Sequence, residues 1–397
     1  MMSPPVWPVV LAGFSAFLGL YATQPLLPLL AREFSATPLA VSFTVTVPTL
    51  AVAAAAPVVG RLADLVGRRR VIVGSAVLLT FATALAATAT TLGQLILWRL
   101  VQGLLTPGIF AITIAYIHER WPLARTGRAT GAYVSGTVTG GFVGRATAGI
   151  VAADASWATA FLTLAAMHAL AAAALWGGLP AEPDRPVPST RPHRRSVGAL
   201  LRNRRLLATN AVGFCVLFVQ VALFTYVTFH LSAAPFFLST AALGWLFVTY
   251  LLGAVVAPFA GQLSDAYGHR TALAGGVTVG VCGAALTLVP WLPAVVLGLA
   301  LSATGVFVAQ ATASSYIGAV TVEDRGLAVG LYSSCYYVGG SLGGTLPAVF
   351  WPAGEWRTTV LLVMTVQVTT WALAWMFWTP LSDGRAMPAA ETASLGS

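Results

Sequence analysis

Long apolar runs cover most of the chain, and short polar segments separate them. A helix needs about 20 mainly apolar residues to cross the hydrocarbon core of a bilayer. Twelve runs come close to this length, which predicts twelve transmembrane helices. The predicted spans are 7–30, 40–59, 71–91, 93–117, 129–152, 156–178, 206–230, 240–260, 272–290, 293–318, 327–350 and 357–379.

The composition supports a membrane protein. Hydrophobic residues make up 57% of the chain and charged residues 8%, whereas a soluble domain carries about 25% charged residues. So few charges cannot cover a water-exposed surface, and we expect lipid to surround most of the exterior. The first apolar run is too long for a signal peptide and has no basic residue before it, so it is expected to remain in the mature protein.

The arginines predict the orientation of the chain. All but four of the 21 basic residues fall in loops or tails on the side that holds both termini. Arg32 and Arg357 fall on the opposite side, and Arg99 and Arg145 fall within spans. Basic loops stay in the cytoplasm, which predicts a multi-pass protein of the cytoplasmic (inner) membrane with both termini inside. This asymmetry also accounts for the net charge of +9, so no nucleic-acid partner is expected.

An internal repeat predicts two six-helix halves. Residues 181–205 form the one long polar stretch, and their proline and arginine content suits a cytoplasmic linker between halves 1–180 and 206–397. Seven residues in 131–157 recur 199 positions later, in 330–356. A duplicated half, with a site where the two copies meet, is typical of transporters. The predicted fold is all-α, with twelve transmembrane helices in two halves related by pseudo-two-fold symmetry.

The loop between spans 2 and 3 carries the strongest motif. It reads Gly60-Arg-Leu-Ala-Asp64-Leu-Val-Gly67-Arg68-Arg69-Arg70, and a second copy runs from Gly261 through Asp265 to Arg270. This loop resembles the signature loop of the major facilitator superfamily, and the resemblance extends over the whole chain. It implies a gate that holds the outward-facing state closed on the cytoplasmic side. The predicted gating residues are Gly60, Asp64, Gly67, Arg68, Arg69, Arg70, Asp265 and Arg270.

Two interpretations of this loop remain open at the level of the sequence. In the first, Asp64 pairs with an arginine or a helix N-terminus of the other half. In the second, the arginines only enforce topology. The second copy keeps the Gly-Asp-Gly frame but has Arg270 alone as an assured cation.

Span 4 contains Arg99-Leu-Val-Gln102-Gly103, which resembles a second motif of the superfamily, Arg-x-x-Gln-Gly. A charge at bilayer depth costs about 2.5–3.5 kcal/mol, so Arg99 must face protein or water. Arg99 and Gln102 share a helix face and are expected to point toward Tyr21 and Gln24 on span 1. In related drug exporters this arginine assists proton transfer or touches substrate. The alternative is an arginine that binds span 1 carbonyls and holds the helices together.

Span 5 has glycine at every third or fourth position, which predicts one face for close helix packing. Its Gly136, Gly140 and Gly144 resemble the Gly-x-x-x-Gly-Pro-x-x-Gly-Gly motif of antiporters, most closely in the arabinose-efflux-permease-like branch of drug:proton antiporters. The chain departs from that motif at Gly141, where proline is expected, and at Arg145, where glycine is expected. Arg145 either reaches the outer interface or is a second cation of the central site.

The chain shows no acidic residue in the middle of a span. Proton-driven transporters commonly use such a buried carboxylate; without it, Glu33, Asp154 or Asp64 would have to carry the proton. Polar and aromatic residues within spans suggest a solute site. The predicted substrate-binding or coupling residues are Tyr21, Gln24, Arg99, Gln102, Arg145, Gln220, Phe224, Gln310, Tyr336 and Tyr337.

The resemblance implies a secondary active transporter that exports a small organic solute by alternating access, coupled to protons as an antiporter of the multidrug-resistance type. The alternative is a carrier or exchanger of anionic or neutral polar solutes, such as an organic acid or a sugar, bound by Arg99 and Arg145. No metal cluster, nucleophile triad or phosphate loop is present in the sequence. We therefore expect no enzymatic activity and no cofactor, and a functional monomer in the bilayer.

Overall fold

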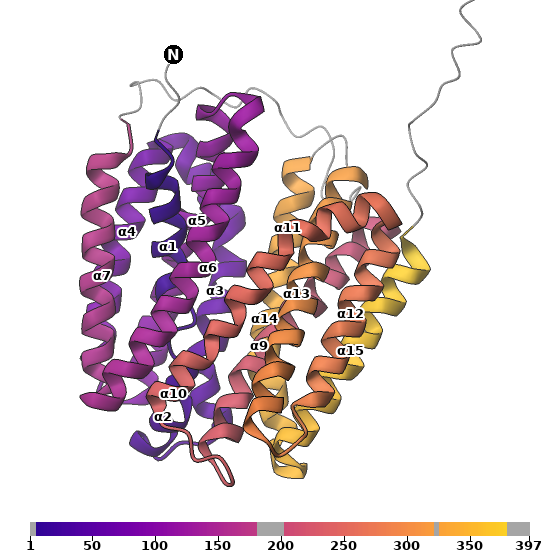
Figure 1. The fold of residues 1–397 in the computed structure, drawn as a ribbon. Coiled ribbons are helices and arrows are strands. Elements are labelled where there is room, and N and C mark those ends of the chain that lie inside the picture. Colours follow the sequence, from indigo (N-terminus) through magenta and orange to yellow (C-terminus); the bar gives the residue numbers. More distant parts are fainter. Residues whose placement is uncertain (1–4, 181–201, 321–324, 379–397) are drawn as a thin grey trace, which may run out of the picture.

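The structure is a computed structural model that describes residues 5–180, 202–320 and 325–378 (Figure 1). The regular elements of these residues are all helices. The first group comprises α1 (Trp7–Leu18), η1 (Gln24–Leu26), α2 (Leu27–Glu33), α3 (Pro38–Val66), α4 (Arg68–Ala86), α5 (Leu92–Arg120), α6 (Leu123–Asp154) and α7 (Trp157–Gly178). The second comprises α9 (Arg204–Ser232), α10 (Thr240–Trp245), η2 (Leu246–Val248), α11 (Thr249–Tyr267), α12 (His269–Leu286), α13 (Leu292–Val320), α14 (Arg325–Phe350), η3 (Trp351–Ala353) and α15 (Glu355–Phe377).

The two groups lie side by side as two bundles (Figure 1). The start of α1 and the ends of α7 and α15 lie at the same end of the molecule, at the top of Figure 1, which we name the terminal end. The opposite end, with α2 and α10, is the distal end. The predicted linker 181–205 lies almost wholly outside the described residues, so the proposed boundaries of the halves stay a prediction.

Helices occupy every predicted span. Seven of the described helices are long and apolar enough on their own to cross a bilayer: α3, α4, α5, α7, α9, α13 and α15. The remaining spans are interrupted or rich in glycine and polar residues, as in α6.

Span 1 is not the continuous helix 7–30 that the sequence predicts. Helix α1 ends at Leu18, the chain turns through 19–23, and a 3-10 helix and α2 complete the crossing. Pro25 and Pro28 explain the break, because proline lacks an N–H and clashes with the carbonyl four residues earlier. In the interrupted segment the Gln24 N–H donates to the Tyr21 carbonyl at 3.1 Å, a bond of the 3-10 type.

Glycines set the closest helix contacts within each half, as the glycine face of span 5 predicts. A Cβ at Gly140 would lie 2.2 Å from the Phe14 carbonyl oxygen, and one at Gly144 would overlap the Leu18 carbonyl of α1. The repeat-related Gly339 on α14 meets the backbone of α9 in the same way. Helix α6 thus packs on α1 as α14 packs on α9, and the sequence repeat is a repeat of helix packing.

The two halves contact each other mainly in the distal part of the bundle. Thr46 of α3 shares a hydrogen bond of 2.7 Å with Thr345 of α14, and Ser341 Oγ donates to the Thr46 carbonyl at 3.1 Å. At a second crossing between the halves, α6 meets α10, where a Cβ at Gly149 would lie 2.8 Å from the Gly244 Cα. We name these two crossings the distal seal.

The terminal end is packed more openly. A Cβ added at Gly60 or Gly131 of the first half, or at their repeat mates Gly261 and Gly330 of the second, would meet no atom within 4 Å. In this conformation, packing does not require glycine at these four positions. At Gly140 and Gly144, by contrast, a side chain would overlap the backbone of α1.

The glycine contacts yield a paired test on one helix. Gly144→Ala would force α6 away from α1 and should lower the free energy of unfolding by about 3 kcal/mol, at the upper end for overpacking. Gly131→Ala should leave it unchanged or raise it by up to about 1 kcal/mol, because alanine favours the helix and meets open space. Thermal unfolding of the purified variants in detergent measures both. Equal melting temperatures would contradict the packing of α6 on α1.

Candidate functional site

Arg145 lies buried between the halves, with 5% of its surface exposed. Three aromatic rings surround its guanidinium carbon. The ring centroid of Tyr21, in the first half, lies 5.0 Å away, and those of Phe247 and Tyr250, in the second half, lie 4.8 Å and 5.0 Å away. We name these three rings the aromatic cage. Of the two sequence interpretations, the structure excludes a side chain that reaches the outer interface, and it places Arg145 in the centre of the contact between halves.

Gln24 links Arg145 to the other half. Its Oε1 accepts a hydrogen bond of 2.7 Å from Arg145 Nε, and its Nε2 donates to Thr225 Oγ1 of α9 at 3.0 Å. The interrupted segment of span 1 presents Gln24 in this position. The sequence predicts Gln24 opposite Arg99, but its partner is Arg145.

The two departures of span 5 from the antiporter motif belong together. Arg145 Nη1 donates to the Gly141 carbonyl at 2.7 Å, one turn earlier on the same helix. A Cβ at Gly141 would lie 3.1 Å from this same nitrogen. The absence of a side chain at 141 therefore makes room for the guanidinium.

Arg99 is also buried, with no exposed surface, but its surroundings are made of oxygen atoms. It donates to the carbonyls of Thr44 at 2.9 Å and Gly19 at 2.8 Å, to the Leu20 carbonyl, and to Gln102 Oε1. Because Gly19 and Leu20 lie where α1 ends, Arg99 satisfies backbone groups that the break exposes. This arrangement is the structural alternative that the sequence left open.

The remainder of the Arg-x-x-Gln-Gly motif also serves packing. Gln102 Nε2 donates to Thr83 Oγ1 at 3.3 Å on α4. A Cβ at Gly103 would lie 2.3 Å from the Pro48 carbonyl oxygen, so glycine permits the close crossing of α5 and α3. The motif fixes α1, α3, α4 and α5 to one another.

The predicted residues of the second half form two groups. Phe224 lies against Tyr250 of the aromatic cage, with ring centroids 4.3 Å apart, and Gln220 lies one turn before it on α9. Gln310 belongs to the other group and accepts a hydrogen bond of 2.8 Å from Tyr332.

Tyr336 and Tyr337 continue the second group along α14. Tyr336 stacks on Tyr332 at 6.0 Å, and Tyr337 contacts Phe110 of the first half at 5.7 Å. The sequence therefore identified residues of both groups, but not that Phe224 of the first group stacks against a ring of the aromatic cage.

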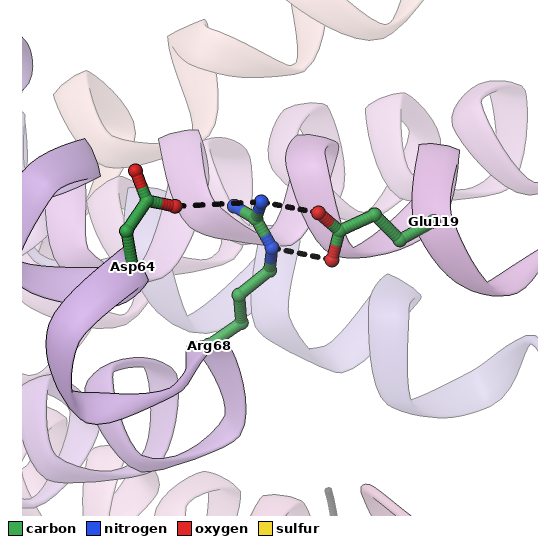
Figure 2. A network of polar contacts seen from close by, with 3 residues as sticks. All are labelled: Asp64, Arg68 and Glu119. Carbon is green, nitrogen blue, oxygen red and sulfur yellow. Dashed lines mark hydrogen bonds and ion pairs between the residues drawn. The ribbon is translucent and has the colours of Figure 1, made fainter. Parts of the chain in front are cut away.

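The signature loop forms an ion-pair network within the first half (Figure 2). Arg68 lies between Asp64, at 3.6 Å, and Glu119 at the end of α5, whose two carboxylate oxygens accept from Arg68 Nε and Nη2. In this conformation Asp64 pairs within its own half rather than with the other one. Gly67 joins α3 to α4 with φ of 102°, and Gly268 joins α11 to α12 with φ of 81°, a backbone region that favours glycine.

The other predicted gating residues lie beside this network. Arg69 donates to the Leu179 carbonyl at 2.8 Å and stacks over Trp176 at 5.9 Å, at the end of α7. Arg270 stacks over Trp375 at 5.8 Å, at the end of α15, which repeats the pair in the second half. Arg70 donates to the carbonyl one turn earlier. The side chain of Asp265 lies outside the described part of the structure, so its role stays a prediction.

Sequence reasoning missed several residues of the site. Tyr250 belongs to the aromatic residues within spans that suggested a solute site, but Phe247 was missed. Phe247 lies three residues before Tyr250, on one face of the interrupted α10–α11 segment, and this spacing was the available signal. Thr225 and Glu119 gave no signal, because their partners Gln24 and Arg68 are distant in the chain.

The sequence profile of the Major Facilitator Superfamily matches residues 9–243 and again 228–394. The chain belongs to the Major Facilitator Superfamily. It is 31% identical over 348 residues to the inner membrane transport protein YnfM of Escherichia coli (strain K12), which covers 87% of this chain and 84% of that one. It is 29% identical over 368 residues to the uncharacterized MFS-type transporter YybF of Bacillus subtilis (strain 168), covering 91% and 90%.

Among solved structures, the fold is similar to that of a bacterial homolog of the human lysosomal transporter Spinster in an inward-facing and occupied conformation. The TM-score is 0.77 at 14% identity, over 95% of this chain and 98% of that one. These comparisons confirm the predicted superfamily and fold, and they establish a multi-pass membrane transporter rather than an enzyme.

The unequal surroundings of the two arginines predict unequal effects on stability. Arg99→Met should lower the free energy of unfolding by about 3 kcal/mol or more, because three buried carbonyls would lose a charged donor, at about 1–3 kcal/mol each, and Thr44 and Gly19 would keep only the longer bonds from Thr23 Oγ1 at 3.4 Å and Ala22 N at 3.2 Å. Arg145→Met removes the donor of only one carbonyl and one amide oxygen. It should lower the free energy of unfolding by less than half as much. Thermal unfolding in detergent compares the two. A larger loss for Arg145→Met would refute the structural role of Arg99.

Proposed function

We propose that this transporter exports a small organic solute across the cytoplasmic membrane by alternating access, with the solute bound at Arg145 and protons as the coupling ion. The observation that carries the proposal is the composition of the aromatic cage. Arg145 and Tyr21 belong to the first half and Phe247 and Tyr250 to the second. A solute bound there touches both halves and can bias how they sit against each other.

Two sets of small residues support the alternation between states. The distal seal holds the halves together by hydroxyl and glycine contacts. The uncovered glycines Gly60, Gly131, Gly261 and Gly330 would permit a similar close approach at the terminal end. In this proposal the terminal end faces the cytoplasm, as the arginine asymmetry indicates, and the described conformation is open to the inside.

The signature loop is the gate of the opposite state. Its Asp64–Arg68–Glu119 network lies at the terminal end and is partly exposed, with 41% of Asp64 accessible. When the terminal ends approach, Asp64 becomes available to the N-terminus of a helix of the second half. Because exposed ion pairs contribute only about 0–1 kcal/mol to stability, the network suits a switch better than a structural clamp.

Export and proton coupling rest on the resemblance of span 5 and of Arg-x-x-Gln-Gly to antiporter motifs. A second candidate function, exchange or uniport of an anionic or polar solute without protons, is favoured by one observation. The ionisable groups close enough to act electrostatically on Arg145 are Tyr21 and Tyr250, and neither is a carboxylate that would release a proton near neutral pH.

Alternating access can be tested before the solute is known. In a background with serine at Cys215, Cys282 and Cys335, Thr46→Cys places a thiol in the distal seal, where the native side chain is 8% exposed. A membrane-impermeant maleimide added to intact cells should label it slowly, because only the outward-open state exposes it. Asp64→Asn should slow labelling about fivefold, the equivalent of about 1 kcal/mol from one ion pair.

Thr90→Cys is the matched control, because Thr90 lies exposed in the distal α4–α5 turn and should be labelled rapidly with or without Asp64→Asn. Absence of Thr46→Cys labelling under conditions that label Thr90→Cys would contradict alternating access. Labelling of Thr90→Cys only in inside-out vesicles would reverse the proposed orientation.

Proton coupling has its own readout. In inside-out vesicles acidified by respiration, an exported solute should enter with proton release, and a fluorescent pH probe should report partial collapse of the gradient within seconds of its addition. Asp64→Asn vesicles should give a collapse about fivefold slower, in line with the expected slowing of Thr46→Cys labelling. Uptake of the same radiolabelled solute without any change in the gradient would favour the uncoupled exchanger.

A further inference from the structure

The two buried arginines differ in how many of their donors the protein uses. A guanidinium has five N–H groups. Arg99 uses four of them on the oxygens of Thr44, Gly19, Leu20 and Gln102. Arg145 uses two, on Gln24 Oε1 and the Gly141 carbonyl, and within the described residues its Nη2 makes no hydrogen bond. Arg145 therefore keeps donors available for a ligand.

The charge of Arg145 is also uncompensated. The ionisable groups that act on it are the two cage tyrosines. The described ion pairs of the chain, Asp64 and Glu119 with Arg68, lie at the terminal end. Aromatic faces stabilise a cation only partly, whereas removal of a charge from water is strongly unfavourable without a partner of opposite charge.

A second polar group without a well-formed hydrogen bond lies in the same cage. Tyr21 is 6% exposed, and its buried hydroxyl interacts with the Thr49 side chain without reaching normal hydrogen-bond geometry. Buried polar groups in native proteins are nearly always paired. The site thus holds a cation with free N–H groups and a phenol O–H without a well-formed hydrogen bond, and both can donate to an anion.

We propose that the transported solute is an organic anion whose carboxylate, or equivalent oxyanion, binds the free N–H groups of Arg145 and the hydroxyl of Tyr21, while its apolar body packs on Phe224 and Tyr250. This inference rests on the proposed function in that it takes Arg145 as the solute site. Arginine binds carboxylates with paired, charge-assisted hydrogen bonds. A lipophilic cation would meet an uncompensated positive charge and is excluded from the site.

Binding is tested with probes that share one body and differ in charge: 3-phenylpropionate, 3-phenylpropan-1-ol and 3-phenylpropan-1-amine, with phenyl phosphate and glucuronate as further anions. Isothermal titration of the purified full-length protein in detergent, supported by thermal shift, gives each dissociation constant. At least one anion should bind saturably, and the amine should not. Arg145→Gln should raise the dissociation constant of that anion at least about tenfold, the loss expected for charge-assisted hydrogen bonds. Tyr21→Phe should raise it about threefold.

Arg32→Gln is the matched control. Arg32 is exposed at the end of α2 near the distal end, and its substitution removes the same unit of charge without touching the cage. It should leave anion binding unchanged. Because Arg145→Gln could disturb folding, Arg145→Lys provides a second variant, which keeps the charge but not the paired donors and should fall between wild type and Arg145→Gln.

Three results would overturn the inference: no anion of the panel binds wild type, the amine binds wild type, or the bound anion keeps its affinity in Arg145→Gln. Each differs from failure of the proposed function. A protein that binds the anion through Arg145 but shows no labelling of Thr46→Cys from outside would retain the ligand assignment and lose alternating access. A protein that is labelled normally but binds only the amine would retain alternating access and lose the ligand assignment.

Discussion

The interruption of span 1 within the bilayer is the constraint on which the central structure depends. Lipid offers no hydrogen bonds, so backbone groups released by a broken helix must find partners inside the protein. Arg99 supplies them, through the carbonyls of Gly19 and Leu20. The irregular backbone that follows is what directs Tyr21 and Gln24 toward Arg145. One buried arginine therefore holds the segment that presents the surroundings of the other.

Close helix packing then fixes the rest of the site. Gly140 and Gly144 bring α6 against α1, so Arg145, one residue further along α6, lies beside the interrupted segment. Gly149 and Gly244 bring α6 against α10. This contact places Phe247 of η2 and Tyr250 of α11, which follow α10, beside Arg145. Residues with no side chain thus determine the distances at which a cation meets three aromatic rings.

The sequence predicted the fold because its signals are local and strong. Apolar runs of about 20 residues, the repeat at 199 positions and the glycine face of span 5 each report a single helix or a single packing face. The break in span 1 was missed because a window of about 20 residues averages the lower hydropathy of 19–26 with the apolar residues on either side. Pro25 and Pro28 nevertheless marked it. Helix boundaries beyond the apolar core, such as the extension of α3 to Val66, were also missed.

The candidate site was predictable only in part, for a different reason. Arg99 and Arg145 stood out equally as charges within spans, and nothing local to either distinguishes an arginine bound by carbonyls from one caged by rings. That distinction depends on partners 55 to 124 positions away, from Thr44 at Arg99 to Tyr21 at Arg145. The same holds for Glu119, which lies 51 positions from Arg68 and became part of the signature network only in three dimensions.

The aromatic cage, which both halves share, has a consequence for how easily an empty carrier changes conformation. In the proposed cycle, opening the distal seal would separate Phe247 and Tyr250 from Arg145 and break the contact between Gln24 and Thr225. An empty carrier that makes this movement leaves a buried cation with fewer partners, whereas a loaded carrier keeps a counter-ion on it throughout. The barrier is thus higher for the empty protein than for the loaded one. Such a difference suppresses slippage, the futile return of an unoccupied carrier, and favours tight exchange of cargo between the two sides of the membrane.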